Sequence, residues 1–332
     1  MLKNIVLSIC IPTYNRASLL KESLYSIVNQ STYNPSKVEI IISDNCSTDN
    51  TEEVVSEFIQ NYDGIVYHKR ATNNGFLNIL SVLQYAKGDF IKILNDYTIF
   101  GNNSLQELLL CVENNIQDKP QIFFGNGRFH TPNISNFYTY ENFLTTITFW
   151  STYLGGFSIW REDYLKCKHL PVEEMFPHTS LLFMQNQKSR YVLNNQILFI
   201  NQKLESKGGY NLFEVFVVNY LAMYDEYVST GMLTKKFIKE EKSRLFNGFI
   251  IDWMIKCFIG NGNTVYTFKT EGAIKILLKY FWYMPSLYLV LFRIGSIRLI
   301  LLVIPRKIYY LACKYLKLPG KLVCKIMNGI SK

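Results

Sequence analysis

Short apolar runs alternate with longer amphipathic stretches over the first 125 residues, and this alternation limits the folds open to the chain. The short runs predict strands at residues 6–11, 38–42, 65–68, 90–94 and 121–124. The longer stretches repeat apolar residues at helical spacing and predict helices at 18–29, 76–86 and 104–113, with another from about residue 51. Strands that alternate with helices form a mainly parallel sheet with right-handed crossovers. We therefore expect an α/β fold of Rossmann type, with helices flanking the sheet.

A polar segment follows each of the first four predicted strands. These segments are residues 12–16, 43–50, 69–75 and 95–98. Each one alone is ordinary turn chemistry, because Asp and Asn-Gly are common turn residues. In an open parallel sheet, however, ligands bind beyond the carboxyl ends of the strands. Four polar segments in succession at these ends predict a binding site along one edge of the sheet.

The sequence around these segments resembles family 2 glycosyltransferases of the GT-A fold, and among them the abequosyltransferase-like enzymes that build O-antigens and capsules. The stretches that carry the resemblance are LSICIPTYNRASLLKESLYSIVNQ, VEIIISDNCSTDNT and NNGFLNILSVLQYAKGDFIKILND. They lie within residues 5–100, whereas residues 126–205 resemble the family only loosely. The resemblance implies an enzyme that moves a sugar, with inversion, from a nucleotide-diphosphate donor to a glycan acceptor, commonly a lipid-linked one.

The resemblance also implies a donor site made by the polar segments. Its donor-binding residues would be Pro12, Tyr14, Arg16, Asp44, Arg70, Asn74, Gly75, Asn78, Asn95 and Asp96. The first three would shape the pocket around the nucleotide. Asp44 would accept a hydrogen bond from the base, as a carboxylate can from an imide N–H. Residues 70–75 would approach the ribose and diphosphate, and Asn78 would hold that loop.

The acidic metal motif of the family is shortened in this chain. It usually reads as two or three consecutive Asp residues, the last of which binds the ion. Here the run is Asn95-Asp96-Tyr97-Thr98, so Asp96 is its one carboxylate and Thr98 stands where the metal ligand is expected. Mg²⁺ or Mn²⁺ at a diphosphate uses one or two carboxylates, and a threonine hydroxyl replaces one poorly. We expect a divalent metal at Asp96, with a metal-independent donor site or an enzyme of low activity as alternatives.

Inverting transfer also needs a general base that removes the proton of the acceptor hydroxyl. The resemblance places a carboxylate with this role in the second half of the domain, where the chain offers Glu174 and His178. The reference imidazole pKa near 6.5 suits His178 to base work, and the two residues are equal candidates. The alternative is a helix-capping histidine beside solvated glutamates.

Aromatic and charged side chains in the rest of the chain have simpler interpretations. Trp150, Tyr153 and Trp160 are candidates for stacking on a sugar ring, with core packing as the alternative. The mixed charges of residues 235–242 predict a solvent-exposed helix face.

The positive charge of the chain is concentrated at its C-terminal end. Residues 275–332 hold eleven of the 35 Lys and Arg residues and no Asp or Glu, so 24 basic residues face all 26 acidic ones in the rest. An evenly basic nucleic-acid binder is therefore disfavoured, and a basic tail that meets an anionic surface is favoured.

The tail is also apolar, and this predicts how it meets a membrane. Residues 286–305 are long enough to span one, but they contain Arg293 and Arg298. An arginine near a bilayer centre costs roughly 2.5–3.5 kcal/mol, which disfavours a spanning helix. In residues 307–317 basic and apolar residues fall on different helix faces, which predicts a helix in the plane of an anionic membrane. The alternative is a tail that packs on the enzyme or on a second copy of it.

These patterns divide the chain into a catalytic domain, a helical extension and a membrane-associating tail, at residues 1–210, 211–271 and 272–332. Within the first, residues 1–125 would bind the donor and 126–210 the acceptor. Seven scattered cysteines without a CxxC pair, and no signal peptide before the first strand, favour a cytoplasmic protein at the inner face of the cell membrane. The rival functions are a non-catalytic scaffold and a sugar nucleotidyltransferase, although residues 12–16 lack the glycines of the latter.

Overall fold

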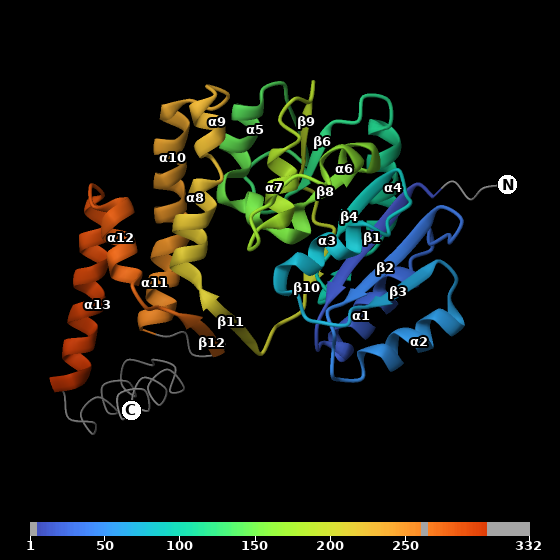
Figure 1. The fold of residues 1–332 in the computed structure, drawn as a ribbon, viewed down its shortest axis with the longest axis horizontal. Helices are drawn as coiled ribbons and strands as arrows, with labels where there is room; N and C mark the ends of the chain where they lie inside the picture. Colours follow the sequence, from blue (N-terminus) through green and yellow to red (C-terminus); the bar gives the residue numbers. More distant parts are fainter. Residues whose placement is uncertain (1–4, 260–264, 304–332) are drawn as a thin grey trace. The chain divides into compact units, whose positions relative to one another are not determined.

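The computed structural model describes residues 5–259 and 265–303, and the chain divides into two compact units after Lys203 (Figure 1). The first unit has the expected α/β architecture, and the second is mainly helical. The division lies close to the boundary predicted at residue 210. The roles assigned to the predicted regions stay predictions.

A five-stranded sheet forms the centre of the first unit. Its strands are β1 (Leu7–Thr13), β2 (Val38–Asp44), β3 (Ile65–Lys69), β4 (Phe90–Ile93) and β8 (Ser158–Trp160). Their order is β3-β2-β1-β4-β8, in which β8 is antiparallel to β4 and the other pairs are parallel. The predicted mainly parallel sheet is therefore confirmed, together with its first four strands.

The segments between the parallel strands are helical, as the sequence predicts. They form α1 (Ala17–Val28), α2 (Thr51–Asn61), the short η1 (Gly75–Leu77) with α3 (Asn78–Leu83), and, after β4, α4 (Ser104–Asn115). Each crossover begins at the carboxyl end of a strand, so the polar segments lie at that edge of the sheet.

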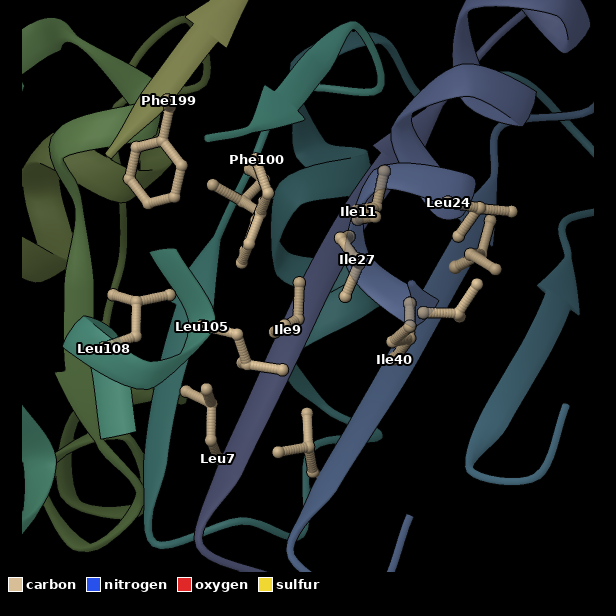
Figure 2. Close-up of a cluster of buried hydrophobic side chains, with 14 of the residues drawn as sticks. Leu7, Ile9, Ile11, Leu24, Ile27, Ile40, Phe100, Leu105, Leu108 and Phe199 are labelled. Carbon is tan, nitrogen blue, oxygen red and sulfur yellow. The ribbon is translucent and has the colours of Figure 1, made fainter. Parts of the chain in front are cut away.

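One hydrophobic cluster joins β1 to α1 and α4. Alternate residues of a strand share a face, and Leu7, Ile9 and Ile11 of β1 are fully buried in this cluster (Figure 2). Leu24 and Ile27 belong to it from α1, because they are three residues apart and share one side of that helix. Burying one such side chain stabilises a fold by about 1.5–3 kcal/mol. The cluster therefore holds the start of α1, and the segment before it, against the sheet.

A buried lysine links β4 to the residues that precede β8. The side chain of Lys92 is fully buried, and its Nζ donates to the carbonyl oxygens of Gly155 at 2.5 Å and Phe157 at 3.0 Å. Burial lowers the pKa of this amine well below its usual value. These bonds hold the end of η3 (Leu154–Gly156), and so the aromatic residues just before it, next to the sheet.

The strand predicted at 121–124 does not join the parallel sheet. It forms β6 (Gln121–Phe124) in a second sheet of order β6-β9-β7, with β7 (Ile134–Phe137) and β9 (Tyr191–Asn194). The edge of the parallel sheet beside β4 is taken by β8, which comes later in the chain. Local sequence pattern predicts that a strand exists, but not which of two edges it pairs with.

The first unit is completed by short elements that the sequence did not predict individually. They are β5 (Thr98–Phe100), α5 (Tyr140–Ile147), η2 (Thr148–Thr152), α6 (Arg161–Cys167), α7 (Pro177–Phe183) and β10 (Phe199–Asn201). Strands β5 and β10 pair antiparallel, so the segment after β4 is fixed by the end of the unit.

The second unit confirms the helical prediction for residues 211–260. Its elements are β11 (Ser206–Asn211), η4 (Glu214–Asn219), α8 (Tyr220–Ala222), α9 (Asp225–Ser229), α10 (Lys235–Leu245), η5 (Phe246–Ile250), α11 (Ile251–Phe258), β12 (Val265–Lys269), α12 (Ala273–Phe281) and α13 (Pro285–Val303). The parallel pair β11–β12 was not predicted, because its first strand is polar and its partner lies far along the chain.

The interpretation of residues 235–242 as a solvated face is wrong for one residue. Glu241 of α10 is fully buried, and its Oε1 accepts a hydrogen bond from the Tyr220 hydroxyl at 2.8 Å. Tyr220 is in turn bonded to the Tyr224 hydroxyl, and Arg244 lies 3.5 Å from Glu241 Oε2. Burial raises the pKa of Glu241 to about 7. Alternating charges in the sequence could not show that one of them faces a tyrosine pair.

The described part of the C-terminal region ends within the predicted tail. Among residues 5–259 and 265–303, no helix has both the length and the apolar character needed to cross a membrane. The surface helix predicted at 307–317 lies outside the described residues. The five cysteines in the described part are all free.

Candidate functional site

The segments after β1 and β2 are bonded to each other. Asn15, with a φ of 50°, donates its N–H to Ser47 Oγ at 2.9 Å and accepts the Thr48 N–H on Oδ1 at 2.8 Å. Asp49 accepts the first N–H of α1, from Ala17, at 3.1 Å. The first two polar segments therefore form one rigid surface. Pro12 lies half-buried in it, and Tyr14 is 43% exposed.

Asp44 ends β2 and is fully buried. Its Oδ1 accepts the Ser47 N–H at 2.9 Å and its Oδ2 accepts the Tyr67 hydroxyl at 2.6 Å. Burial and this bond to Asp44 raise the pKa of Tyr67. A carboxylate has about four lone-pair sites, so Asp44 retains acceptor capacity for a further donor. Its contact with a base stays a prediction, and its bond to Tyr67 is one that the sequence did not indicate.

Asn45 ties the third polar segment to the second, and sequence reasoning missed this role. Its Nδ2 donates to Asn73 Oδ1 at 2.9 Å and to the Gly75 carbonyl at 3.0 Å, while its Oδ1 accepts the Asn74 N–H at 2.9 Å. Gly75 has a φ of 58°, in the region that favours glycine. Asn74 and Gly75 are exposed. The available signal was that Asn45 directly follows the strand-end Asp44.

The sequence predicted that Asn78 would hold the loop of residues 69–75, but its side chain bonds elsewhere. It is 3% exposed, and its amide both accepts from the Ser43 hydroxyl and donates to the Ser43 carbonyl at 2.7 Å. It therefore fixes the end of β2. Arg70 is half-buried and donates to Ser81 Oγ at 2.6 Å, while its buried Nε has no hydrogen-bond partner within the described residues.

Asp96 joins the fourth polar segment to the first. Its side chain is 2% exposed, with Oδ1 2.9 Å from an Arg16 terminal nitrogen and Oδ2 accepting the Thr13 hydroxyl at 2.8 Å. The Tyr14 backbone N–H also bonds the carboxylate. Burial raises the pKa of Asp96, and the Arg16 charge acts in the opposite direction. Asn95, beside it, is half-buried. All four predicted segments are thus bonded into one surface.

The residues at this position do not fit a divalent metal. The Thr98 hydroxyl donates to Asn201 Oδ1 at 3.0 Å, so it is engaged in the β5–β10 pair. Both oxygens of Asp96 already accept hydrogen bonds from Arg16 and Thr13. In the part of the chain that the structure describes, no three His, Cys, Asp or Glu side chains group closely enough to hold an ion. A metal here would have to displace an arginine from a single buried carboxylate.

A second arginine lies beside the same segment, and the sequence analysis did not identify it. Arg128 follows β6, donates to the Gly125 carbonyl at 3.1 Å, and stacks with its Cζ 4.0 Å from the centre of the Tyr153 ring. Arg16 lies 5.4 Å from the centre of the Tyr97 ring. Burial raises the pKa of Tyr97 to about 12, while Arg16 and Arg128 both act to lower it. The charges of both guanidinium groups therefore act on one phenol.

The three aromatic candidates for sugar stacking separate into two kinds. Trp160 is 1% exposed, donates from Nε1 to the Pro120 carbonyl at 2.8 Å, and packs on Phe90 with ring centres 4.8 Å apart. It belongs to the core and cannot stack on a sugar. Trp150 and Tyr153 are half-buried, and both lie against Arg128.

The two candidate bases have different surroundings. His178 is 4% exposed, and its Nε2 is 3.0 Å from the Thr152 carbonyl. Burial lowers its pKa to about 4, against the opposing effect of that carbonyl, so the ring is neutral near pH 7. The pKa near 6.5 that suited His178 to base work is therefore wrong for the folded chain. Glu174 is exposed in the turn before α7.

Comparison with known proteins shows a family match that covers all four strand-end segments. Residues 8–171 match the model of Glycosyl transferase family 2. The chain is 41% identical to abequosyltransferase RfbV of Salmonella typhimurium over 102 residues, 30% of each chain. It is 36% identical to the GalNAc(5)-diNAcBac-PP-undecaprenol beta-1,3-glucosyltransferase of Campylobacter jejuni over 95 residues, 27% of this chain and 29% of that one. These alignments span under a third of the curated relatives.

Solved structures with a similar fold cover almost the whole chain. S. aureus TarS 1–349 in complex with UDP-GlcNAc aligns with a TM-score of 0.61 and 17% identity, over 97% of this chain and 89% of that one. Mannosyltransferase PcManGT from Pyrobaculum calidifontis, in complex with GDP-Man and Mn²⁺, aligns with a TM-score of 0.50 and 15% identity, over 98% and 87%. At these identities the likeness establishes the GT-A fold of the chain.

Proposed function

Because residues 8–171 form a family 2 glycosyltransferase domain, we propose that the chain transfers a sugar from a nucleotide-diphosphate donor to a lipid-linked glycan in surface polysaccharide synthesis. The observation that carries this proposal is the joining of the four strand-end segments into one polar surface. Asp96 is bonded to Arg16 across two of them, and Asn45 binds the loop of Asn74 and Gly75. Such an edge is where open α/β sheets bind nucleotides.

In this proposal the donor lies along the sheet edge. Pro12, Tyr14 and Arg16 border the nucleotide, and Asp44 accepts from the base. The exposed loop of Asn74 and Gly75, with Arg70 behind it, borders the ribose and diphosphate. Asn95 and Asp96 lie at the fourth segment, where Asp96 fixes the Arg16 guanidinium. Asn78 holds the end of β2 beneath this edge through its bonds to Ser43.

Glu174 is the general base of the proposed inverting transfer. A base must reach the acceptor hydroxyl, and Glu174 is exposed whereas His178 is buried with Nε2 bonded to a carbonyl. The lowered pKa of His178 also removes the advantage that an unperturbed imidazole would have over a carboxylate as a base. His178 instead supports η2 through Thr152, just ahead of Tyr153.

The proposed acceptor and location follow from the described C-terminal helices. α12, α13 and the segment between them expose a set of apolar side chains, here called the C-terminal apolar face: Ile274, Leu278, Trp282, Tyr283, Tyr288, Leu289 and Phe292. The exposed basic residues Lys275, Lys279 and Arg293 lie among them along the same helices. Apolar and basic side chains together suit an anionic membrane surface. The undecaprenol-linked acceptor in the name of the C. jejuni relative supports a lipid-linked one here.

The deciding experiment offers UDP-, GDP-, CDP- and dTDP-sugars to the purified full chain, with a membrane lipid extract as acceptor. Labelled sugar in the lipid phase from one donor, and its loss in the Asp44→Ala variant, is the expected result. Formation of a nucleoside triphosphate from a sugar nucleotide and inorganic pyrophosphate would instead identify a nucleotidyltransferase. Nucleotide binding without any product would favour the non-catalytic scaffold, and a dimer that binds no vesicles would place α12 and α13 at a contact between copies.

A further inference from the structure

We infer that Arg16 and Arg128 together replace a divalent metal at the donor diphosphate, so that the chain binds nucleoside diphosphates without Mg²⁺ or Mn²⁺. This inference rests on the proposed function, since it takes the ligand to be a nucleotide donor. It assigns a binding role to Arg128, a residue outside the four strand-end segments.

The first step is that the carboxylate at the metal position is already neutralised. The side chain of Asp96 is 2% exposed, and its two oxygens accept from Arg16 and Thr13 at 2.9 and 2.8 Å. An ion that took Asp96 would leave the Arg16 guanidinium without its acid and next to a second positive charge. The pair therefore opposes a metal at Asp96.

The second step is that no neighbouring side chain makes up the missing ligand. The residue two positions on is Thr98, and its hydroxyl is bonded to Asn201 in the β5–β10 pair. A single carboxylate with both oxygens engaged is a poor site for a hard cation that wants several oxygen ligands. The charge that a diphosphate needs must then come from elsewhere in the site.

The third step is that two guanidinium groups are positioned to supply it. Arg16 uses one terminal nitrogen on Asp96, and its side chain is 39% exposed, so its other N–H donors remain open to a ligand. The Cζ of Arg128 lies over the Tyr153 ring, 4.0 Å from its centre, and 5.3 Å from the centre of the Trp150 ring. The charges of both act on the Tyr97 hydroxyl. A guanidinium group can bind a phosphate through two parallel N–H donors.

The stacking on Tyr153 also predicts which substitution is tolerated. A lysine carries the same charge but is a point donor that does not stack as a planar fork. Arg128→Lys should therefore recover only part of the affinity that Arg128→Ala loses. Arg161 serves as a matched control in the same unit, because it donates to the Ala86 carbonyl from the start of α6.

The test is titration calorimetry of the full chain with UDP, GDP, CDP and dTDP, each in EDTA and in Mn²⁺. We expect the preferred diphosphate to bind with the same Kd within about twofold in both buffers. Arg128→Ala should weaken it at least tenfold in EDTA, while the matching unphosphorylated nucleoside binds as before. Arg161→Ala should change neither, and circular dichroism verifies that each variant is folded.

Three results would overturn the inference, and they separate it from the proposed function. Diphosphate binding that disappears in EDTA and returns with Mn²⁺ would show that a metal, not the arginine pair, holds the phosphates, and the donor site would stand. Equal binding by Arg128→Ala and the unaltered chain would remove Arg128 from the site. Failure of every diphosphate to bind in either buffer would refute the donor site itself, and the inference with it.

Discussion

A carboxylate is buried beside an arginine in each unit of this chain, and the two sites differ in what surrounds them. In the first unit, Asp96 is bonded to Arg16 at 2.9 Å and to the Thr13 hydroxyl. In the second, Glu241 is bonded to the Tyr220 hydroxyl and lies 3.5 Å from Arg244. Burial raises the pKa of both carboxyls, and that of Glu241 reaches about 7.

The difference teaches that burial beside an arginine does not mark a functional site by itself. The partners of Asp96 come from the segment after β1, which is one of four polar segments at the same sheet edge. The partners of Glu241 come from α8 and from its own helix, within a helical unit. We therefore expect substitutions at Asp96 to change transfer and those at Glu241 to change stability.

The largest expected effect on the rate of transfer belongs to a third carboxylate, Glu174. Because Glu174 is exposed, it tests whether a carboxylate must be buried to act in the reaction. Glu174 is exposed, and its replacement in Glu174→Gln should lower kcat by a factor of about 10² to 10⁴, the usual contribution of a general base. His178→Gln should retain most of the rate, because its amide nitrogen lies where Nε2 does and can still donate to the Thr152 carbonyl. Initial rates with saturating donor and acceptor give both values.

The opposite ranking would assign the base to His178. A pH profile alone does not separate the two residues, because the pKa of about 4 for His178 removes the fall near pH 6.5 that an unperturbed imidazole would produce. The paired variants are therefore the decisive measurement.

The next largest effect is on the stability of the second unit. The folded pKa of Glu241 is raised from 4.5 to about 7, so the folded chain binds more protons than the unfolded chain between these values. Stability is then lost as pH rises through this range, by about 3 kcal/mol for the single group. Glu241→Gln stays neutral and keeps an oxygen for the Tyr220 hydroxyl, so it should remove this loss.

The measurement is urea unfolding of both proteins at pH 5 and pH 8, followed by far-ultraviolet circular dichroism. Other carboxyls titrate in both proteins, so the difference between them isolates Glu241. An identical pH dependence in the two would show that Glu241 is not buried in its neutral form. A loss of transfer by Glu241→Gln at unchanged stability would break the comparison between the units.

Asp96→Ala should lower kcat/KM by a factor of about ten to a hundred. Hydrogen bonds to charged groups are worth about 1.5–3 kcal/mol, and this variant releases Arg16 from its fixed position. Asp118→Ala is a matched control, since Asp118 bonds Arg190 at 2.7 Å in the same unit but outside the strand-end segments. Rates that fall equally in both variants would point to a general loss of stability and undo the role of Asp96.

The sequence predicted the strand-end half of the site because its chemistry is local. Residues such as Asp44 and Asp96 directly follow strands, and parallel strands bring their carboxyl ends to one edge. Asn45 could be named only from the structure, because its bonds run to a loop about thirty residues away. The predicted helix 76–86 was confirmed over Asn78–Leu83; η1 occupies its first turn, and the helix ends three residues earlier than predicted.

Residues after 125 could be predicted much less well, because their environment depends on distant pairing. β8 reaches the edge of β4 from 65 or more residues along the chain, and this buried Trp160 instead of exposing it. The burial of His178, and with it the lowered pKa, comes from packing of α7 near η2. A residue type suggests a chemical role, but the side chains packed around it decide whether it can fill that role.

The smallest expected effect concerns the C-terminal apolar face of the second unit. Deleting residues from Lys275 onward would also remove Leu277 and Phe281, which are fully buried, so single substitutions test this face more cleanly. Leu289 is 71% exposed, and Leu289→Ser should lower binding to anionic vesicles about three- to tenfold, through partial loss of apolar burial. Ile197→Ser, at a 77% exposed site in the first unit, should leave binding unchanged.

Flotation at low and high salt completes the test: attraction to headgroups is screened within about 10 Å at 0.1 M, so binding should weaken as salt rises. Binding that is equal for neutral and anionic vesicles and insensitive to salt would contradict the basic contribution, and no binding to either would assign this face to a protein contact.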